Sequence, residues 1–126
     1  MKAAFVDSSV IVALALGESA ASEVRTRLRQ FDRVFASRLL EAEVASACRR
    51  ENIPFDPRFL DSIEWVGMSH SLRTEIDRVL AHGYVRGADC HHLATALYLS
   101  PAPAALTFVT LDVRQQDVAR HLGFLV

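Results

Sequence analysis

Residues 3–14 read AAFVDSSVIVAL, in which the acid Asp7 separates two apolar runs. The first run, residues 3–6, has the length and composition of a buried strand, and the second, from Val10, can begin a helix. A strand followed at once by a helix is the first unit of an α/β fold. Burying a lone carboxylate costs several kcal/mol unless another group compensates its charge. The stretch therefore predicts both a fold class and a partner for Asp7.

The rest of the chain continues this alternation of short apolar runs with amphipathic stretches. Such alternation favours a layered α/β fold with a mainly parallel sheet. We predict strands at residues 3–6, 33–36, 63–68, 106–110 and 124–126. We predict helices at residues 10–16, 19–30, 37–51, 69 or 71 to 82, 88–99 and 113–122. The length of 126 residues suits one domain, residues 1–126.

Composition excludes several classes of protein. The net charge of −1 gives no overall basic surface for general nucleic-acid binding. Lys2 is the only lysine, so a phosphate-binding loop with its lysine is absent. Cys48 and Cys90 form no CxxC pattern, which disfavours a disulfide framework or a thiolate zinc site. The first residues lack a signal peptide and no apolar run reaches about 20 residues, so we expect a cytoplasmic protein without a membrane span.

Two acids lie just after predicted strands. Asp7 comes after the strand at residues 3–6, and Asp112 comes after the strand at residues 106–110. In a parallel sheet, ligands bind beyond the carboxyl ends of the strands, so these acids converge if their strands are neighbours. The alternative for Asp112 is a helix cap alone, because Asp112 and Gln115 have the spacing of a capping box.

Two further acids lie on predicted helices. Glu43 falls inside the apolar stripe of its helix, whereas Glu41 falls at the edge of that stripe. Asp89 opens the helix at residues 88–99 and borders its apolar face. The structural alternative for Glu43 is a side chain that extends to the solvent. The structural alternative for Asp89 is an acid that interacts favourably with the helix dipole in the first turn.

Convergence of Asp7, Glu43, Asp89 and Asp112 requires a counter-charge. Two carboxylates about 4 Å apart repel by roughly 4 kcal/mol at an effective dielectric constant near 20. The residues beside them in the sequence are mostly apolar, small or hydroxylic. A divalent cation is the simplest partner, and ligands made only of oxygen suit Mg²⁺ or Mn²⁺ better than Zn²⁺. We therefore predict that Asp7 shares a metal ion with other acids.

Four stretches together resemble a known family. They are FVDSSVIVAL (residues 5–14), SRLLEAEVASACRR (37–50), RGADCHHLATAL (86–97) and FVTLDVRQQDVARHLGF (108–124). In order and spacing, over nearly the whole chain, they resemble PIN-domain ribonucleases, specifically the VapC-type toxins of type II toxin–antitoxin pairs. The resemblance implies a three-layer α/β/α sandwich around a parallel sheet.

The resemblance also implies an activity. The family's acidic quartet, which binds Mg²⁺ or Mn²⁺, falls on Asp7, Glu43, Asp89 and Asp112. Its small hydroxyl positions fall on Ser8 and Thr110. The implied function is a toxin, an endoribonuclease that hydrolyses RNA phosphodiester bonds and inhibits translation. The implied partners are an antitoxin protein and a second copy of the chain.

Other side chains have more than one interpretation. Arg86 and Arg114, near Asp89 and Asp112, could contact the RNA backbone or be ordinary surface arginines. His91 and His92 point about 100° apart on a helix, so they do not chelate one ion together and we interpret them as non-catalytic. Tyr84, Trp65 and the phenylalanines show no basic-aromatic interleaving, and we expect most of them in the core. Asp117, one helical turn after Asp112, is expected to be solvated.

Two rival functions remain open. One is a PIN-like module that binds RNA or protein without cutting. The other is a phosphotransferase or phosphatase that forms an aspartyl-phosphate on Asp7, which is disfavoured because DSS lacks a second acid two residues on and the chain has no internal lysine.

Overall fold

The computed structural model describes all residues, 1–126. Its centre is a four-stranded, all-parallel sheet in the order β3-β2-β1-β4. The strands are β1 (Ala3–Val6), β2 (Arg33–Ser37), β3 (Ile63–Val66) and β4 (Thr107–Val109). Because Val6 pairs with Val109, the residues that follow, Asp7 and Thr110, leave the sheet side by side. The sheet therefore makes neighbours of β1 and β4, as convergence of Asp7 and Asp112 requires.

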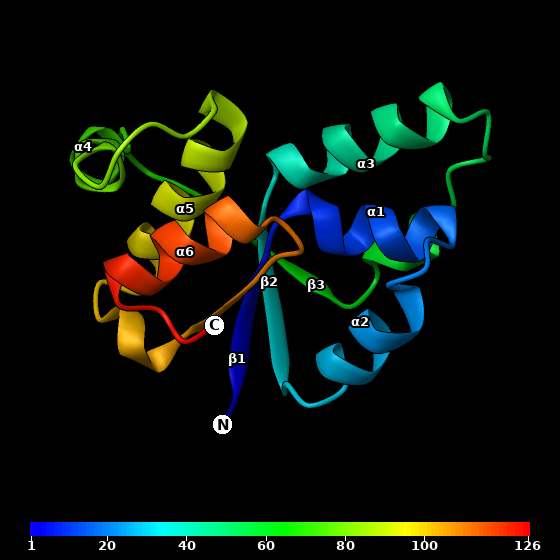
Figure 1. The fold of residues 1–126 in the computed structure, drawn as a ribbon, viewed down its shortest axis with the longest axis horizontal. Helices are drawn as coiled ribbons and strands as arrows, with labels where there is room; N and C mark the ends of the chain where they lie inside the picture. The colour runs from blue at the N-terminus through cyan, green and yellow to red at the C-terminus, as the bar shows by residue number, and fades with distance from the viewer.

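Helices cover both faces of this sheet. They are α1 (Ser8–Leu16), α2 (Ala21–Leu28), α3 (Leu39–Arg50), α4 (Arg73–Leu80), α5 (Gly87–Leu99) and α6 (Val113–Leu122). Figure 1 shows α1, α2 and α3 on one side of the sheet and α4, α5 and α6 on the other. The predicted three-layer α/β/α sandwich with a parallel sheet is thus confirmed. None of these helices has the length and apolar character needed to cross a membrane.

The core has two halves, one on each face of the sheet. Phe5 belongs to the half under α4, α5 and α6, where its ring stacks on that of Phe108 with 5.7 Å between centroids. Ala4 and Val6, which alternate with Phe5 along β1, belong to the half under α1 and α3. A central parallel strand is buried on both faces, which explains why residues 3–6 are all apolar.

Several predicted element ends were wrong. The helix predicted at residues 19–30 spans only Ala21–Leu28, and no side chain caps it. Ser37, predicted to open a helix, is instead the last residue of β2 and pairs with Val66. The strand predicted at residues 124–126 is reduced to one bridge between Thr107 and Leu125. Two short 3-10 helices, Pro57–Leu60 and Pro103–Ala105, were not predicted, although each begins with a proline, as is common at a first helical position.

Candidate functional site

The four predicted acids line one cleft at the carboxyl end of the sheet. Its volume is about 410 Å³, and Asp7, Glu43, Asp89 and Asp112 all contribute to its wall. The other lining residues are Ser8, Ser9, Val12, Glu18, Ala47, Arg50, Arg86 and Leu111. Figure 1 shows the beginnings of α1, α3 and α6 around this end of the sheet. Residues that are distant in the sequence therefore meet at the place where open parallel sheets bind ligands.

Asp7 is buried, with 3% of its surface exposed. Its Oδ1 accepts a hydrogen bond from the Ser9 hydroxyl at 2.6 Å, and its Oδ2 accepts one from the Thr110 hydroxyl at 2.8 Å. Burial raises the pKa of Asp7, the two hydroxyl donors lower it in part, and the nearby charge of Asp89 raises it further. The partners of Asp7 in this structure are therefore hydroxyl groups, and no arginine or lysine pairs with it.

The backbone orients both hydroxyl groups toward Asp7. The Ser9 Oγ accepts the N–H of Leu111 at 3.0 Å, and the Thr110 Oγ1 accepts the N–H of Asp112 at 3.0 Å. Because a carboxylate only accepts, each hydroxyl donates its own hydrogen to Asp7 while its oxygen accepts the backbone hydrogen. The sequence pattern did not predict this contact of Ser9. Its position two residues after an aspartate, typical of local side-chain bonding, could have indicated this contact.

Glu43 is held by a buried histidine from another helix. The Nε2 of His92 lies 2.6 Å from the Glu43 Oε1, and its Nδ1 lies 2.9 Å from the Ser37 hydroxyl. A carboxylate only accepts, so Nε2 carries the hydrogen, and a neutral ring then accepts the Ser37 hydrogen at Nδ1. His92 is 1% exposed and Ser37 is fully buried. The hydrogen bond from His92 is the largest cause that lowers the pKa of Glu43, against the opposing effect of burial.

This role of His92 was not predicted from the sequence, because the two histidines were considered only as a pair of metal ligands. His92 follows Asp89 by three residues on α5. Residues three apart lie on the same face of a helix, so this spacing could have placed His92 beside the acids. His91 is half-buried, and burial lowers its pKa.

Asp112 both caps α6 and lines the cleft. Its Oδ1 accepts the N–H groups of Arg114 at 2.9 Å and Gln115 at 3.1 Å, which confirms the predicted cap. The suggested capping box is only half formed, because the Asp112 N–H donates to Thr110 and not to Gln115. Asp112 Oδ2 makes no hydrogen bond, so this oxygen remains available in the cleft.

Asp89 has an exposed cation beside it. Its Oδ2 lies 3.3 Å from the Nε of Arg86, and its side chain is 20% exposed. Asp117, in contrast, lies outside the cleft and pairs with Arg120 on the surface at 3.2 Å. The structure therefore separates the four acids of the cleft from the neighbouring acid that was expected to be solvated.

The donor set fits a hard divalent cation. Carboxylate and hydroxyl oxygens surround the cleft, and such oxygens suit Mg²⁺ or Mn²⁺. No group of three or more His, Cys, Asp or Glu side chains is arranged to hold one ion. The reason is visible in the contacts, since Asp7, Glu43 and Asp89 each have a separate partner and Asp112 binds the backbone. The chemistry of the donors fits the cation, whereas their arrangement is that of four separately held acids.

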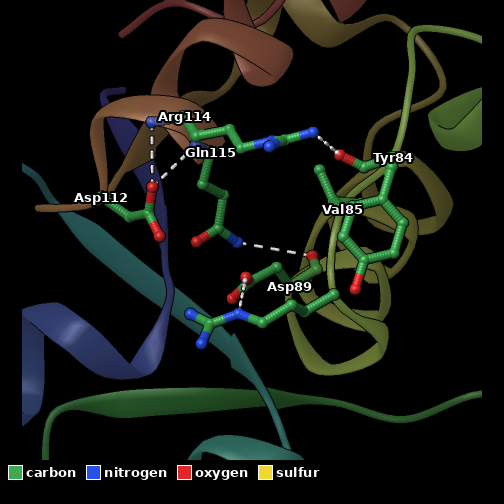
Figure 2. Close-up of a pocket in the computed structure, with 7 residues that line it drawn as sticks. Tyr84, Val85, Asp89, Asp112, Arg114 and Gln115 are labelled. Carbon is green, nitrogen blue, oxygen red and sulfur yellow. Dashed lines mark hydrogen bonds and ion pairs between the residues drawn. The ribbon is translucent and has the colours of Figure 1, made fainter.

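A second hollow of about 310 Å³ adjoins the cleft and shares Arg86, Asp89 and Asp112 with it. Its other lining residues are Tyr84, Val85, Arg114 and Gln115 (Figure 2). Tyr84 is 70% exposed, so it is an exception to the expectation that most of the aromatic residues lie in the core. The guanidinium carbon of Arg114 lies 5.6 Å from the centre of the Tyr84 ring, and its Nη2 donates to the Tyr84 carbonyl.

Comparison with known proteins gives one positive result. A search among curated proteins finds no match for the chain. The family model of the PIN domain matches residues 4–121, a range that contains all four acids of the cleft, and domains of this family are generally metal-dependent nucleases. Since the match covers nearly the whole chain, the protein belongs to the PIN domain family.

Proposed function

We propose that the protein is a metal-dependent endoribonuclease that hydrolyses RNA phosphodiester bonds with Mg²⁺ or Mn²⁺ and acts as the toxin of a toxin–antitoxin pair. The observation that carries the nuclease proposal is the meeting of Asp7, Glu43, Asp89 and Asp112 in one cleft. These acids come from four separate segments of a PIN domain. A structural role alone gives no reason for four carboxylates to face the same solvent-filled space.

Each acid has a distinct part in the proposed chemistry. A divalent ion, when bound, supplies a Lewis acid that activates water and neutralises charge on the leaving oxygen. Asp7 or Asp89 would hold that ion directly, and Ser8 and Thr110 line or support the site. A further carboxylate takes the proton from the attacking water. Glu43 would complete the oxygen ligands of the ion, because the hydrogen bond from His92 keeps it ionised and fixes its direction.

Two arginines are suited to the RNA backbone. Arg86 lines both the cleft and the adjoining hollow, and Arg114 lines the hollow. Arginine binds phosphate with a planar, forked set of donors. Arg114 has no ion pair with a carboxylate in the structure, so its charge is available to a phosphate. These contacts would position an RNA strand across the acids without selecting its sequence.

The toxin role rests on the resemblance to VapC-type proteins. We propose an antitoxin peptide as a partner, a homodimer as the active assembly and the cytoplasm as the place of action. A hollow of about 290 Å³ between α1, α2 and the 3-10 helix at Pro57–Leu60 supports the peptide partner. Leu14, Leu28 and Phe59 line it, with Arg25 and Arg29 beside them. Such a lining suits a segment that carries both apolar and acidic side chains.

The decisive experiment compares cleavage of mixed cellular RNA with Mg²⁺, with Mn²⁺ and with a chelator. We expect the wild-type protein to cut only with a metal ion. Asp7→Asn and Asp89→Asn should each lower the rate by at least about a hundredfold. Asp117→Asn is the matched control, because this exposed acid lies outside the cleft and should leave the rate unchanged. Cutting that persists in both cleft variants would contradict the proposal.

A non-cutting PIN module is the second candidate. One observation favours it, namely that no three of the possible ligands are arranged around a shared ion. RNA binding without cleavage with any metal ion, and with the same affinity in Asp7→Asn, would support this candidate.

The toxin role has a separate test in cells. Expression of the wild-type protein should arrest bacterial growth, whereas expression of Asp7→Asn should not. Light scattering of the purified protein tests the homodimer.

A further inference from the structure

The hollow beside the acidic cleft is lined by one exposed aromatic ring and several polar side chains. Its wall combines an exposed aromatic ring, two arginines and one amide, from Tyr84, Arg86, Arg114 and Gln115. Figure 2 shows Asp112 and Gln115 on one side of this hollow and Tyr84 and Val85 on the other. Its volume of about 310 Å³ is at the lower end of the range for small-molecule sites.

Tyr84 is placed as a stacking surface and not as a packing residue. It is 70% exposed, and it belongs to neither half of the hydrophobic core. Arg114 of α6 donates to the Tyr84 carbonyl, and its guanidinium lies over one face of the ring, so the opposite face is the one left for a partner. An aromatic ring that is exposed offers its face to a flat apolar partner. In proteins that bind single-stranded nucleic acid, that partner is an unpaired base.

The side-chain amide of Gln115 makes only long contacts within the protein. Gln115 is buried, yet both of its side-chain contacts are long, at 3.4 Å to the Asp89 carbonyl and 3.4 Å to the Thr110 hydroxyl. These distances exceed the usual range for hydrogen bonds, so the amide can exchange them for a better partner. An amide that both donates and accepts matches the edge of a base.

We propose that this hollow, lined by Tyr84, Arg114 and Gln115, binds an unpaired base next to the phosphodiester bond that is cut. The inference rests on the proposed nuclease function and adds a place where one base of the substrate is held beside the bond that is cut. The base stacks on Tyr84, and Arg114 contacts the adjoining phosphate. A base within a duplex is stacked and paired on both sides and cannot reach Tyr84 without leaving the helix.

The test measures binding without cleavage. A short single-stranded RNA with one fluorescent purine analogue is titrated in a chelator, so that emission reports stacking while the strand stays intact. For the wild-type protein we expect quenching. Tyr84→Leu, which keeps the apolar bulk and removes the aromatic face, should weaken binding about tenfold and abolish the quenching. Tyr84→Phe should retain both. Arg114→Ala should also weaken binding, and Arg120→Ala is its matched control for charge on α6, because Arg120 lies outside the hollow.

The outcomes separate this inference from the proposed function. Equal affinity and quenching in the wild type and Tyr84→Leu would overturn the base site, even where metal-dependent cleavage is intact. Quenching that depends on Tyr84, in a protein that cuts no RNA, would support the base site and refute the nuclease. The same RNA annealed to its complement should bind with no dependence on Tyr84, and an equal loss for the duplex would refute a site for unpaired bases. Thermal unfolding of Tyr84→Leu should match the wild type, because the side chain is exposed.

Discussion

The carboxylates at two places in the molecule have opposite environments. At the edge of the sheet, Arg33 of β2 donates to Glu64 of β3, from Nη2 to Oε1 at 2.6 Å and from Nε to Oε2 at 2.8 Å. Both side chains are exposed. At the carboxyl end of β1, Asp7 is buried and has only the hydroxyl groups of Ser9 and Thr110 as partners. The first acid is matched by a cation in solvent, whereas the second is not matched by any cation.

The pKa values of these two acids shift in opposite directions, in agreement with their environments. The bond from Arg33 lowers the pKa of Glu64, whereas burial raises the pKa of Asp7. A carboxylate that serves the fold is expected to have its charge matched within the protein. A carboxylate whose charge is left unmatched in a cleft is more typical of a functional site. The comparison thus indicates that the cleft is built for a ligand and the sheet edge is built for the fold.

Replacing His92 should have the largest effect on the cleft. His92→Leu removes the donor that fixes Glu43, so we expect the cleavage rate and the affinity for Mn²⁺ to fall by about ten- to a hundredfold. His92→Gln can still donate to Glu43 and should recover part of the loss. Cleavage assays and calorimetric titration of Mn²⁺ measure the two effects.

The control for His92 is its neighbour. His91 makes no side-chain hydrogen bond with an acid of the cleft, so His91→Leu should leave the affinity for Mn²⁺ unchanged. An equal loss in His91→Leu and His92→Leu would show that the region needs its packing and not the contact with Glu43.

The fold could be predicted from the sequence where local pattern decides structure. Residues 3–6 are apolar on both faces, and this pattern correctly predicted a central strand. Ser37 was misplaced because a serine before an apolar helix is a common start signal. Its hydroxyl instead contacts His92, which lies 55 residues further along the chain. Local sequence contains no information about such a contact, so the end of β2 was missed.

The residues of the candidate site also divide into those that local sequence indicated and those that it did not. The acids that line the cleft were selected as candidates because Asp7 and Asp112 follow strands and because Glu43 breaks an apolar stripe, which are local signals. The groups that hold them, such as His92, were missed because their partners come from other elements. The exposure of Tyr84 was also missed, since an aromatic residue in a loop has no periodic pattern to show which side faces solvent.

Thr110→Val should destabilise the fold by about 2 kcal/mol. The change keeps the shape of the side chain but removes a donor to buried Asp7 and an acceptor for the Asp112 N–H. Urea unfolding at neutral pH in a chelator gives the free energy. Thr107→Val is the matched control within β4, because its hydroxyl makes no hydrogen bond and the expected change is within about 0.5 kcal/mol. Equal losses in both variants would show that the contact with Asp7 contributes nothing.

Asp7→Asn should stabilise the fold by about 1 kcal/mol at neutral pH, although it removes the proposed activity. An acid with a raised pKa in the folded state lowers stability as the pH rises from its unfolded pKa through its folded pKa. The advantage of the variant should therefore be present at neutral pH and shrink as the pH falls toward 3.8, the ordinary value for aspartate. Urea unfolding across this pH range in a chelator measures it. Lower stability of Asp7→Asn at neutral pH would mean that the hydroxyl groups outweigh burial.

Glu64→Gln should have the smallest effect. The pair with Arg33 is exposed, so solvent and salt screen it. An acid with a lowered pKa contributes stability above its unfolded pKa and loses that contribution as the pH falls through its folded pKa. The small difference between the variant and the wild type should therefore vanish in acid and at high salt, as thermal unfolding can measure. A loss of stability as large as that of Thr110→Val would contradict the comparison. The exposed pair of Glu64 and Arg33 would then stabilise the fold as much as the Thr110 hydroxyl, which contacts the buried Asp7.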